Sequence, residues 1–454
     1  MSAEIATYVA KKNQKPVFIC THCEYSTVKW MGQCPGCGKW NTLEERILSS
    51  TPSRKIRSSI KPASITEKEK SDSITRLSSK MKEFDKLLGG GIVPGSVILL
   101  AGDPGVGKST FLLALAKSGY RCLYVSGEES LSQVQDRAKR VGAMLPTVLF
   151  LHETSLETIL AVIEKEKPDL VFIDSIQTVY SGEARGFAGS VSQIRDAAGM
   201  FLELAKRMNI PFVLTGHITK EGQIAGPRLL EHAVDVVLYF EHEKKGPYRF
   251  IRAIKNRFGA TGEIAVFQMT SSGLQEIPPN KTLVNITESG GIGSILFPQM
   301  EGSRVLLHEI QALVTPTGFA NGRRVGENID LSRIHLIAAI LEKYMSMRLS
   351  ECDIFIRVRG GTPLKDPAAD LALLLAMASS FLEKPIPAAV AAFGEVSLSG
   401  DIRPASETKE RLKALLAYKI QKVFVGSKAE ASPYPDQAIR VLQTLNEIPA
   451  ALGS

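Results

Sequence analysis

Short apolar runs alternate with helix-type patterns along the chain between residues 76 and 275. Six of the runs have the length and composition of buried strands. This alternation predicts an α/β domain, in which a mostly parallel sheet is covered by helices. The six predicted strands are Val97–Ala101, Cys122–Val125, Val148–Leu151, Leu170–Ile173, Phe212–Leu214 and Val234–Phe240.

The pattern changes on both sides of this region. Residues 1–45 contain four clustered cysteines and both tryptophans, which predicts a small separate module. Residues 46–75 are rich in Ser, Lys, Glu and Pro, a composition typical of a flexible linker. Residues 285–454 form a third region, with strand-like runs and long helical patterns at Leu331–Tyr344 and Ala368–Phe381. A chain of 454 residues is also too long for a single core, so we expect two or three domains.

Composition and charge argue against a membrane or secreted protein but do not identify a binding partner. The formal net charge of +8 is compatible with a polyanionic partner but does not demand one. No apolar run approaches the ~20 residues of a membrane-spanning helix. The N-terminal residues lack the basic and apolar segments of a signal peptide. We therefore expect a cytoplasmic protein with no membrane partner.

A phosphate-binding loop is the clearest chemical signal. Residues 102–109 match the pattern G-x-x-x-x-G-K-[ST] at every fixed position, between a predicted strand and a predicted helix. Backbone N–H groups of such a loop surround phosphates, and the helix N-terminus adds partial positive charge. Lys108 would reach the β- and γ-phosphates of ATP, and the Ser109 hydroxyl would hold Mg²⁺. The predicted nucleotide-binding residues are Gly102, Asp103, Pro104, Gly105, Val106, Gly107, Lys108, Ser109 and Thr110.

Other predicted strands end in polar residues that suit the same nucleotide. Asp174 ends an apolar run and fits the carboxylate that holds the Mg²⁺ hydration shell. Glu128 and Glu129 come just after the strand that follows the phosphate-loop helix, where a carboxylate would lie beside the γ-phosphate. The alternative is that both only begin a helix, since acidic residues favour a first turn. His217 ends another strand, where it either contacts the γ-phosphate or has a structural role.

The four clustered cysteines have the spacing of a zinc site. Two C-x-x-C pairs are separated by ten residues, and the second pair includes the small residues of a tight turn. Disulfides are rare in the cytoplasm, which leaves a redox dithiol and an iron–sulfur site as the competing interpretations. We expect a structural Zn²⁺ bound by Cys20, Cys23, Cys34 and Cys37. Lys29 and Lys39 of this module either contact nucleic acid or form a solvated basic surface.

Several motifs together resemble a known family. Gly89–Gly95, the phosphate loop, Lys255–Gly259 and the cysteine module are similar to the RadA family of bacterial DNA repair proteins, also called Sms, over essentially the whole chain. The core of that family is similar to RecA and to DnaB-related ring helicases. The resemblance implies that Glu128 is the catalytic carboxylate. It also implies that Lys255 and Arg257 reach the nucleotide of the neighbouring subunit in a homo-hexameric ring, where a cation stabilises charge on the phosphoryl group.

The resemblance extends to DNA-facing loops and to a Lon-like domain. Residues 181–193 and 218–230 match loops that grip single-stranded DNA in RecA, with Lys220 and Arg228 as candidate contacts. The third region is similar to the Lon peptidase domain, and Lys409 matches its catalytic lysine. Ala368 stands where the family has the serine nucleophile, so no proteolysis is expected. Candidate phosphate contacts in that region are Arg304, Arg323, Arg324 and Arg333.

The resemblance implies a DNA-dependent ATPase motor for recombinational repair. Such a motor would translocate on single-stranded and branched DNA and extend or branch-migrate recombination intermediates alongside RecA. One alternative is an ATP-dependent protease, which Ala368 disfavours. Another is an ATP-switched DNA-binding scaffold, because motors and switches use the same phosphate site.

Overall fold

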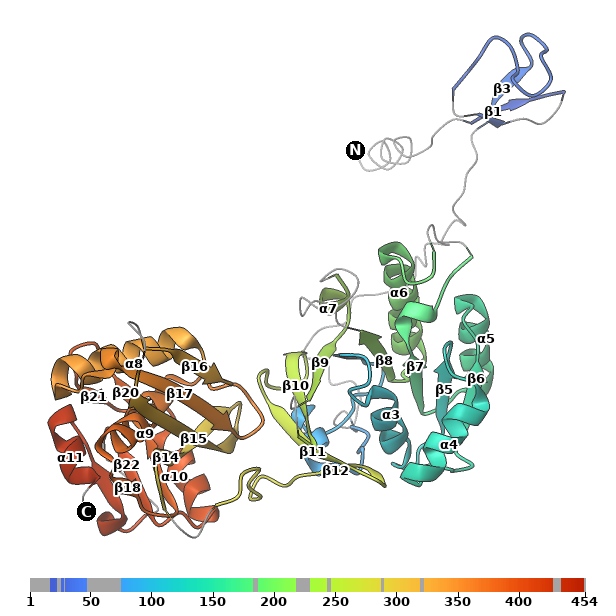
Figure 1. Cartoon of the computed structure of the whole chain (residues 1–454). Coiled ribbons are helices and arrows are strands. Elements are labelled where there is room, and N and C mark those ends of the chain that lie inside the picture. The colour runs from blue at the N-terminus through green and yellow to red at the C-terminus, as the bar shows by residue number, and fades with distance from the viewer. Residues whose placement is uncertain are drawn as a thin grey trace, which may run out of the picture. The chain divides into compact units, whose positions relative to one another are not determined.

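The chain divides into two compact units, Met1–Ser71 and Asp72–Ser454. The computed structural model is drawn in Figure 1. No helix of the described part of the chain is both long and apolar enough to cross a membrane. The described residues are 17–22, 26–27, 29–46, 75–182, 187–217, 229–242, 246–286, 290–318, 322–427 and 434–452.

The described residues of the first unit form a small antiparallel sheet with very few buried hydrophobic side chains. The three strands have the order β2-β1-β3, and within residues 17–22, 26–27 and 29–46 the buried cluster consists of Cys20, Cys34 and Leu43. So small a core supplies little stability by itself, which is why such modules depend on a metal or on disulfides. The strands are β1 (Val17–Cys20), β2 (Ser26–Thr27) and β3 (Leu43–Arg46).

A nine-stranded sheet organises the first part of the second unit. Its order is β12-β11-β10-β9-β4-β8-β7-β5-β6. The strands from β9 to β6 in this order pair in parallel, while β9 to β12 form antiparallel pairs. All six predicted strands are confirmed, and β10–β12 extend the sheet beyond them. The strands are β4 (Val97–Gly102), β5 (Cys122–Ser126), β6 (Val148–His152), β7 (Leu170–Asp174), β8 (Phe212–His217), β9 (Val236–His242), β10 (Tyr248–Asn256), β11 (Ile264–Thr270) and β12 (Gly273–Glu276).

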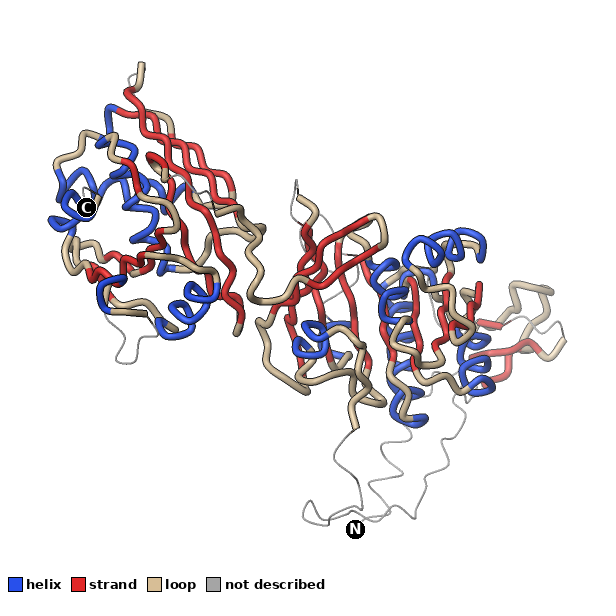
Figure 2. Tube along the Cα trace, turned by 90° about the horizontal axis from the view of Figure 1, so that it is seen from below, coloured by secondary structure: helices blue, strands red, loops and turns tan. Residues whose placement is uncertain are grey.

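Helices cover both faces of this sheet, as Figure 2 shows. One buried cluster joins α2, α3 and α4 to one face, and a second cluster joins α5 and α6 to the other. The local sequence determines where α4 begins and ends. Ser130 is the N-cap residue and forms a capping box with Gln133. Gly142 ends the helix with a positive φ of 67°. The helices are α2 (Lys82–Leu87), α3 (Lys108–Ala116), α4 (Leu131–Val141), α5 (Leu156–Glu166), α6 (Val191–Met208) and α7 (Leu229–Ala233).

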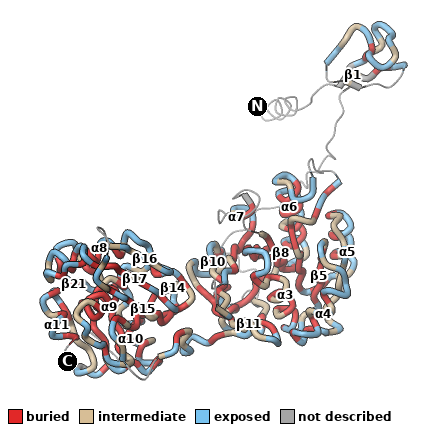
Figure 3. The backbone as a smooth tube through the Cα atoms, in the orientation of Figure 1, coloured by how far each residue is buried: buried red, intermediate tan, exposed pale blue. Residues whose placement is uncertain are grey.

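The remainder of the second unit contains a seven-stranded sheet and a central helix. The sheet order is β16-β17-β15-β14-β19-β22-β23. Helix α9 (Asp370–Leu382) is buried along most of its length (Figure 3), because its sequence is apolar on every side. It starts two residues after the prediction, since the Asp366 carboxylate caps a short 3₁₀ turn first. The other elements are β13 (Gly291–Ile292), β14 (Ser294–Glu301), β15 (Arg304–Pro316), β16 (Arg324–Glu327), α8 (Leu331–Met345), β17 (Cys352–Arg359), β18 (Pro385–Ile386), β19 (Val390–Phe393), β20 (Glu395–Val396), β21 (Ile402–Arg403), α10 (Thr408–Ala417), β22 (Lys422–Val425), β23 (Ile439–Val441) and α11 (Ile448–Ala451).

Candidate functional site

The phosphate loop connects the end of β4 to the start of α3. Gly105 and Gly107 have φ values of 78° and 114°, which residues with a side chain rarely adopt. A β-carbon at Gly102 would lie 2.4 Å from the carbonyl oxygen of Phe240, so this position also requires glycine. The loop is therefore shaped by backbone geometry that only these glycines permit, at a helix N-terminus suited to phosphate.

Lys108 lies at the bottom of this loop. Its Nζ donates hydrogen bonds to the carbonyl oxygens of Gly102 at 2.8 Å and Asp103 at 3.0 Å. The side chain is buried, and burial lowers the pKa of Lys108, while the nearby carboxylates of Asp174, Asp103 and Glu128 oppose that shift. Two backbone carbonyl oxygens of the loop therefore hold the Lys108 amine in place.

Asp174 ends β7, next to β5 and β8. The Tyr124 hydroxyl donates to its Oδ2 at 2.5 Å, and the Thr215 hydroxyl donates to its Oδ1 at 2.7 Å. Burial together with Asp174 raises the pKa of Tyr124 well above its ordinary value, so the phenol remains a proton donor. Sequence reasoning missed both donors, although each is a polar side chain within an apolar strand. They hold the carboxylate in one orientation, as a residue that orders a Mg²⁺ hydration shell requires.

The structure distinguishes the two adjacent glutamates after β5. Arg137 of α4 binds both oxygens of Glu129, with distances of 2.5 and 2.6 Å. Glu129 therefore has a structural partner, although neither glutamate lies in the first turn of α4, which begins at Leu131. Glu128 instead accepts a hydrogen bond from the Ser175 hydroxyl at 3.0 Å, directly after Asp174. Of the pair, Glu128 is the carboxylate placed beside the candidate Mg²⁺ and phosphate residues.

His217, the last residue of β8, lies beside Lys108. Its Nδ1 lies 3.3 Å from Lys108 Nζ. Because an ammonium group only donates, Nδ1 is the acceptor and the ring is neutral. Burial and the charge of Lys108 both lower the pKa of His217. Four parallel strands thus bring Lys108, Glu128, Asp174 and His217 to one edge of the sheet.

Within the chain, Lys255 and Arg257 contact residues outside the phosphate loop. Lys255 Nζ donates to the carbonyl oxygens of Glu231, His232 and Val234 at 2.7–2.9 Å, at the C-terminal end of α7. Burial lowers the pKa of Lys255, with a further decrease from Arg257. The Arg257 side chain is 50% exposed and pairs with Asp235 at 3.2 Å. Among the contacts between described residues, none joins these two cations to the phosphate loop.

The candidate DNA-contacting residues that the structure describes differ in how far their side chains are exposed. Lys220 and Arg228 lie outside the described residues. The Arg304 side chain is only 2% exposed and pairs with Glu83, so the structure does not support a phosphate contact there. Arg333 is also largely buried, in an ion pair with Asp370.

Two neighbouring arginines remain closer to the surface. Arg323 is over half exposed, although its guanidinium pairs with Asp353. Arg324 donates to the carbonyl oxygens of Cys352 and Leu349. These interactions leave Arg323 as the more accessible of the two guanidinium groups.

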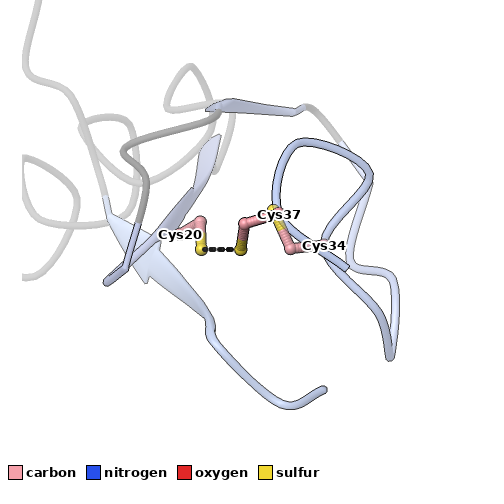
Figure 4. Close-up of side chains that lie close together, drawn as sticks. All are labelled: Cys20, Cys34 and Cys37. Atoms are coloured by element: carbon pink, nitrogen blue, oxygen red, sulfur yellow. Dashed lines mark hydrogen bonds between the residues drawn. The ribbon is translucent and has the colours of Figure 1, made fainter. Parts of the chain in front are cut away.

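Three of the four predicted zinc ligands meet in the first unit (Figure 4). The Sγ atoms of Cys20, Cys34 and Cys37 all lie within 4.8 Å of one another, and Cys20 and Cys37 are 3.7 Å apart. Two sulfur atoms on a tetrahedral Zn²⁺ would be about 3.8 Å apart, given a Zn–S bond of about 2.3 Å. The sulfur positions therefore fit Zn²⁺. Cys23 lies outside the described residues.

The positions that the resemblance matches to the Lon catalytic centre lie beside a buried ion pair. Ala368 is buried and offers no nucleophile. Arg411 of α10 is also buried and binds Asp366 at 2.7 Å, two residues from Ala368. Lys409, two residues earlier in the sequence, is exposed. Without a hydroxyl at position 368 no acyl intermediate can form there.

Comparison with known families matches three parts of the chain. Residues 64–223 match the AAA domain family, residues 18–45 match the rubredoxin metal binding domain, and residues 327–445 match the Lon protease (S16) C-terminal proteolytic domain. These matches agree with the phosphate loop, the cysteine cluster and the Lon-like region, so the mixed α/β architecture with an N-terminal zinc ribbon is established.

Whole proteins are similar over nearly the full length. The DNA repair protein RadA of Bacillus subtilis is 44% identical over 419 residues, which cover 89% of this chain and 91% of the relative. That of Aquifex aeolicus is 44% identical over 92% of this chain and 94% of its own length. That of Listeria monocytogenes is 41% identical over 93% and 94%. Identity of this extent over nearly the full length shows that the chain belongs to the RadA family of DNA repair proteins.

Proposed function

We propose that this protein is a DNA-dependent ATPase that drives branch migration or strand-exchange extension in recombinational DNA repair, in the cytoplasm. The observation that carries the proposal is the grouping of Lys108, Glu128, Asp174 and His217 at one edge of the sheet, around a phosphate loop. Bound ATP and Mg²⁺ would supply the phosphoryl group and the free energy of its hydrolysis.

Each residue of the group has a distinct role in this proposal. The Lys108 amine binds phosphate oxygens, and the Ser109 hydroxyl and the Asp174 carboxylate hold the Mg²⁺ shell. Glu128 orients a water molecule and accepts its proton, while Ser175 holds that carboxylate at 3.0 Å. Neutral His217 contacts Lys108 at the end of β8, directly before residues 218–230 in the sequence, so it would link the nucleotide to the predicted DNA-facing loop.

We infer a homo-hexameric ring that translocates on single-stranded or branched DNA and works with the RecA recombinase. In that ring Arg257, and Lys255 after release from α7, would act on the nucleotide of the neighbouring subunit. The family and the exposed Arg257 side chain support this arrangement. A protease is disfavoured by Ala368 and by the Asp366–Arg411 pair.

A strand-displacement measurement tests the motor against the ATP-switched scaffold. A branched DNA substrate is incubated with the protein and either ATP or a non-hydrolysable analogue. We expect branch migration with ATP only, and none with Lys108→Ala, whose phosphate contact no neighbour replaces. Migration that is equal with the analogue would identify a scaffold instead. Casein added to the same reactions should remain intact.

A further inference from the structure

Both tryptophans of the chain lie on the surface of the zinc module. Trp30 is 58% exposed and Trp40 is 69% exposed, and the 454 residues contain no other tryptophan. Burial of such rings would stabilise a module whose hydrophobic cluster is very small. Large aromatic side chains that remain on the surface instead of in the core are typical of a binding site.

The two rings approach each other across one glycine. Gln33 and Trp40 form an antiparallel bridge, and the Asn41 N–H donates to the Gly32 carbonyl oxygen at 2.8 Å. A β-carbon at Gly32 would lie 3.6 Å from the Trp40 ring and 3.9 Å from the Trp30 ring. The turn that holds the second cysteine pair therefore brings both rings to the same spot, with no side chain between them.

A cation accompanies each ring. The sequence repeats the pair Lys-Trp, as Lys29-Trp30 and Lys39-Trp40, and both lysines are exposed. Residues 29–41 contain no aspartate or glutamate. Protein–protein interfaces are depleted in lysine, whereas aromatic rings beside cations are the standard means of holding single-stranded nucleic acid. The charge and the rings together therefore favour nucleic acid over a protein partner.

We propose that the zinc module is a separate contact site for single-stranded DNA. Trp30 and Trp40 stack on bases, and Lys29 and Lys39 contact the flanking phosphates. The stacking needs no particular base, so the site is indifferent to sequence. The proposal rests on the DNA-dependent function proposed above, and it adds a contact in a part of the chain that has no role in ATP chemistry.

Tryptophan emission reports on this site alone, because both tryptophans belong to it. The full-length protein is titrated with a fluorescein-labelled thymidine 30-mer, and label anisotropy and tryptophan emission are followed in the same samples. We expect emission to be quenched in parallel with the rise in anisotropy. The double variant Trp30→Leu/Trp40→Leu should bind the oligonucleotide at least about tenfold more weakly, since stacking of each base contributes to affinity.

The lysines are tested by the salt dependence of binding. In Lys29→Gln/Lys39→Gln the slope of log affinity against log salt should fall by about 1.4, which is the effect of two phosphate contacts on a single strand. Lys165→Gln, an exposed lysine on α5, is the matched control and should leave the slope unchanged. Each variant must retain about one zinc per chain, which shows that the module is still folded.

Two results would overturn the proposal, and they differ in meaning. Anisotropy that rises while tryptophan emission stays constant would show that DNA binds elsewhere, so that the exposed rings serve a protein partner. Anisotropy that does not rise at all would also refute the DNA-dependent function.

Discussion

At the scale of single residues, the adjacent glutamates after β5 provide a matched pair of variants. Glu128 contacts Ser175 beside Asp174, whereas Glu129 is bound by Arg137. We expect Glu128→Gln to lower kcat for ATP hydrolysis by about 100-fold or more, the usual contribution of a general base. ATP affinity should persist, because Lys108 and Ser109 provide it. The measurement is steady-state hydrolysis together with binding of a fluorescent ATP analogue.

Glu129→Gln is the control for this prediction. The amide keeps a hydrogen bond to Arg137, so kcat should stay near that of the wild type. If Glu129→Gln loses turnover and Glu128→Gln does not, the assignment of the two residues is reversed.

His217 should make the stability of the protein depend on pH in the acidic range. Its folded-state pKa lies below the ordinary value of about 6.5, so the unfolded chain binds this proton first as the pH falls. Stability is therefore lost as the pH decreases from about 6.5 towards the folded-state pKa. The loss stays below the limit of about 1.4 kcal/mol per pH unit, because the ring is partly exposed and solvent screens it.

Urea unfolding between pH 5 and 8 measures this effect, with His217→Gln as the comparison. Glutamine retains a hydrogen-bonding side chain but does not titrate. The urea concentration at the unfolding midpoint should therefore decrease less in the variant than in the wild type as the pH falls. Identical pH profiles for the two proteins would show that the proton is bound elsewhere.

At the scale of elements, strands and turns were predictable where the signal is local. The six apolar runs became strands, and the glycines of residues 102–107 specify a loop by their backbone freedom alone. Contacts between distant segments were not predictable. Tyr124 and Thr215 meet Asp174 only because β5, β7 and β8 are neighbours in the sheet.

Buried charge was the other feature that the sequence did not reveal. Arg304 and Arg411 look like ordinary surface cations in the sequence, yet each is buried against a carboxylate. Residue type alone does not report burial, and a buried arginine is stable only when its partner is present. An arginine that contacts DNA and an arginine in a structural ion pair can therefore look the same in the sequence.

The zinc module is the element whose fold depends on a bound ion. Cys34→Ser should lose the roughly one zinc per chain and unfold the module, because four thiolates complete the tetrahedral shell and the core is too small to compensate. Metal analysis checks this directly. Cys352→Ser is the control, since burial raises the pKa of that thiol and it lies on β17. An iron–sulfur chromophore in the wild type would contradict the assignment.

At the scale of the whole molecule, the ring that we propose raises the question of which cation would complete a neighbour's nucleotide site. Lys255 would first have to leave three carbonyl oxygens at the end of α7, each within 2.9 Å. Among the described residues Arg257 has one carboxylate partner, Asp235, and its side chain is half exposed. The loss of contacts is smaller for Arg257, so it is the better candidate for action in trans.

A mixing experiment tests this. Arg257→Ala should lose DNA-stimulated hydrolysis while it still binds ATP, because a cation from the next subunit acts mainly on the transition state. Lys108→Ala should be inactive through loss of its own phosphate contact. In mixed rings some interfaces pair an intact phosphate loop with an intact Arg257, so partial activity should return. If subunit exchange is demonstrated and no activity returns, Arg257 acts within its own chain, where its contact with Asp235, the residue before β9, would give it a structural role.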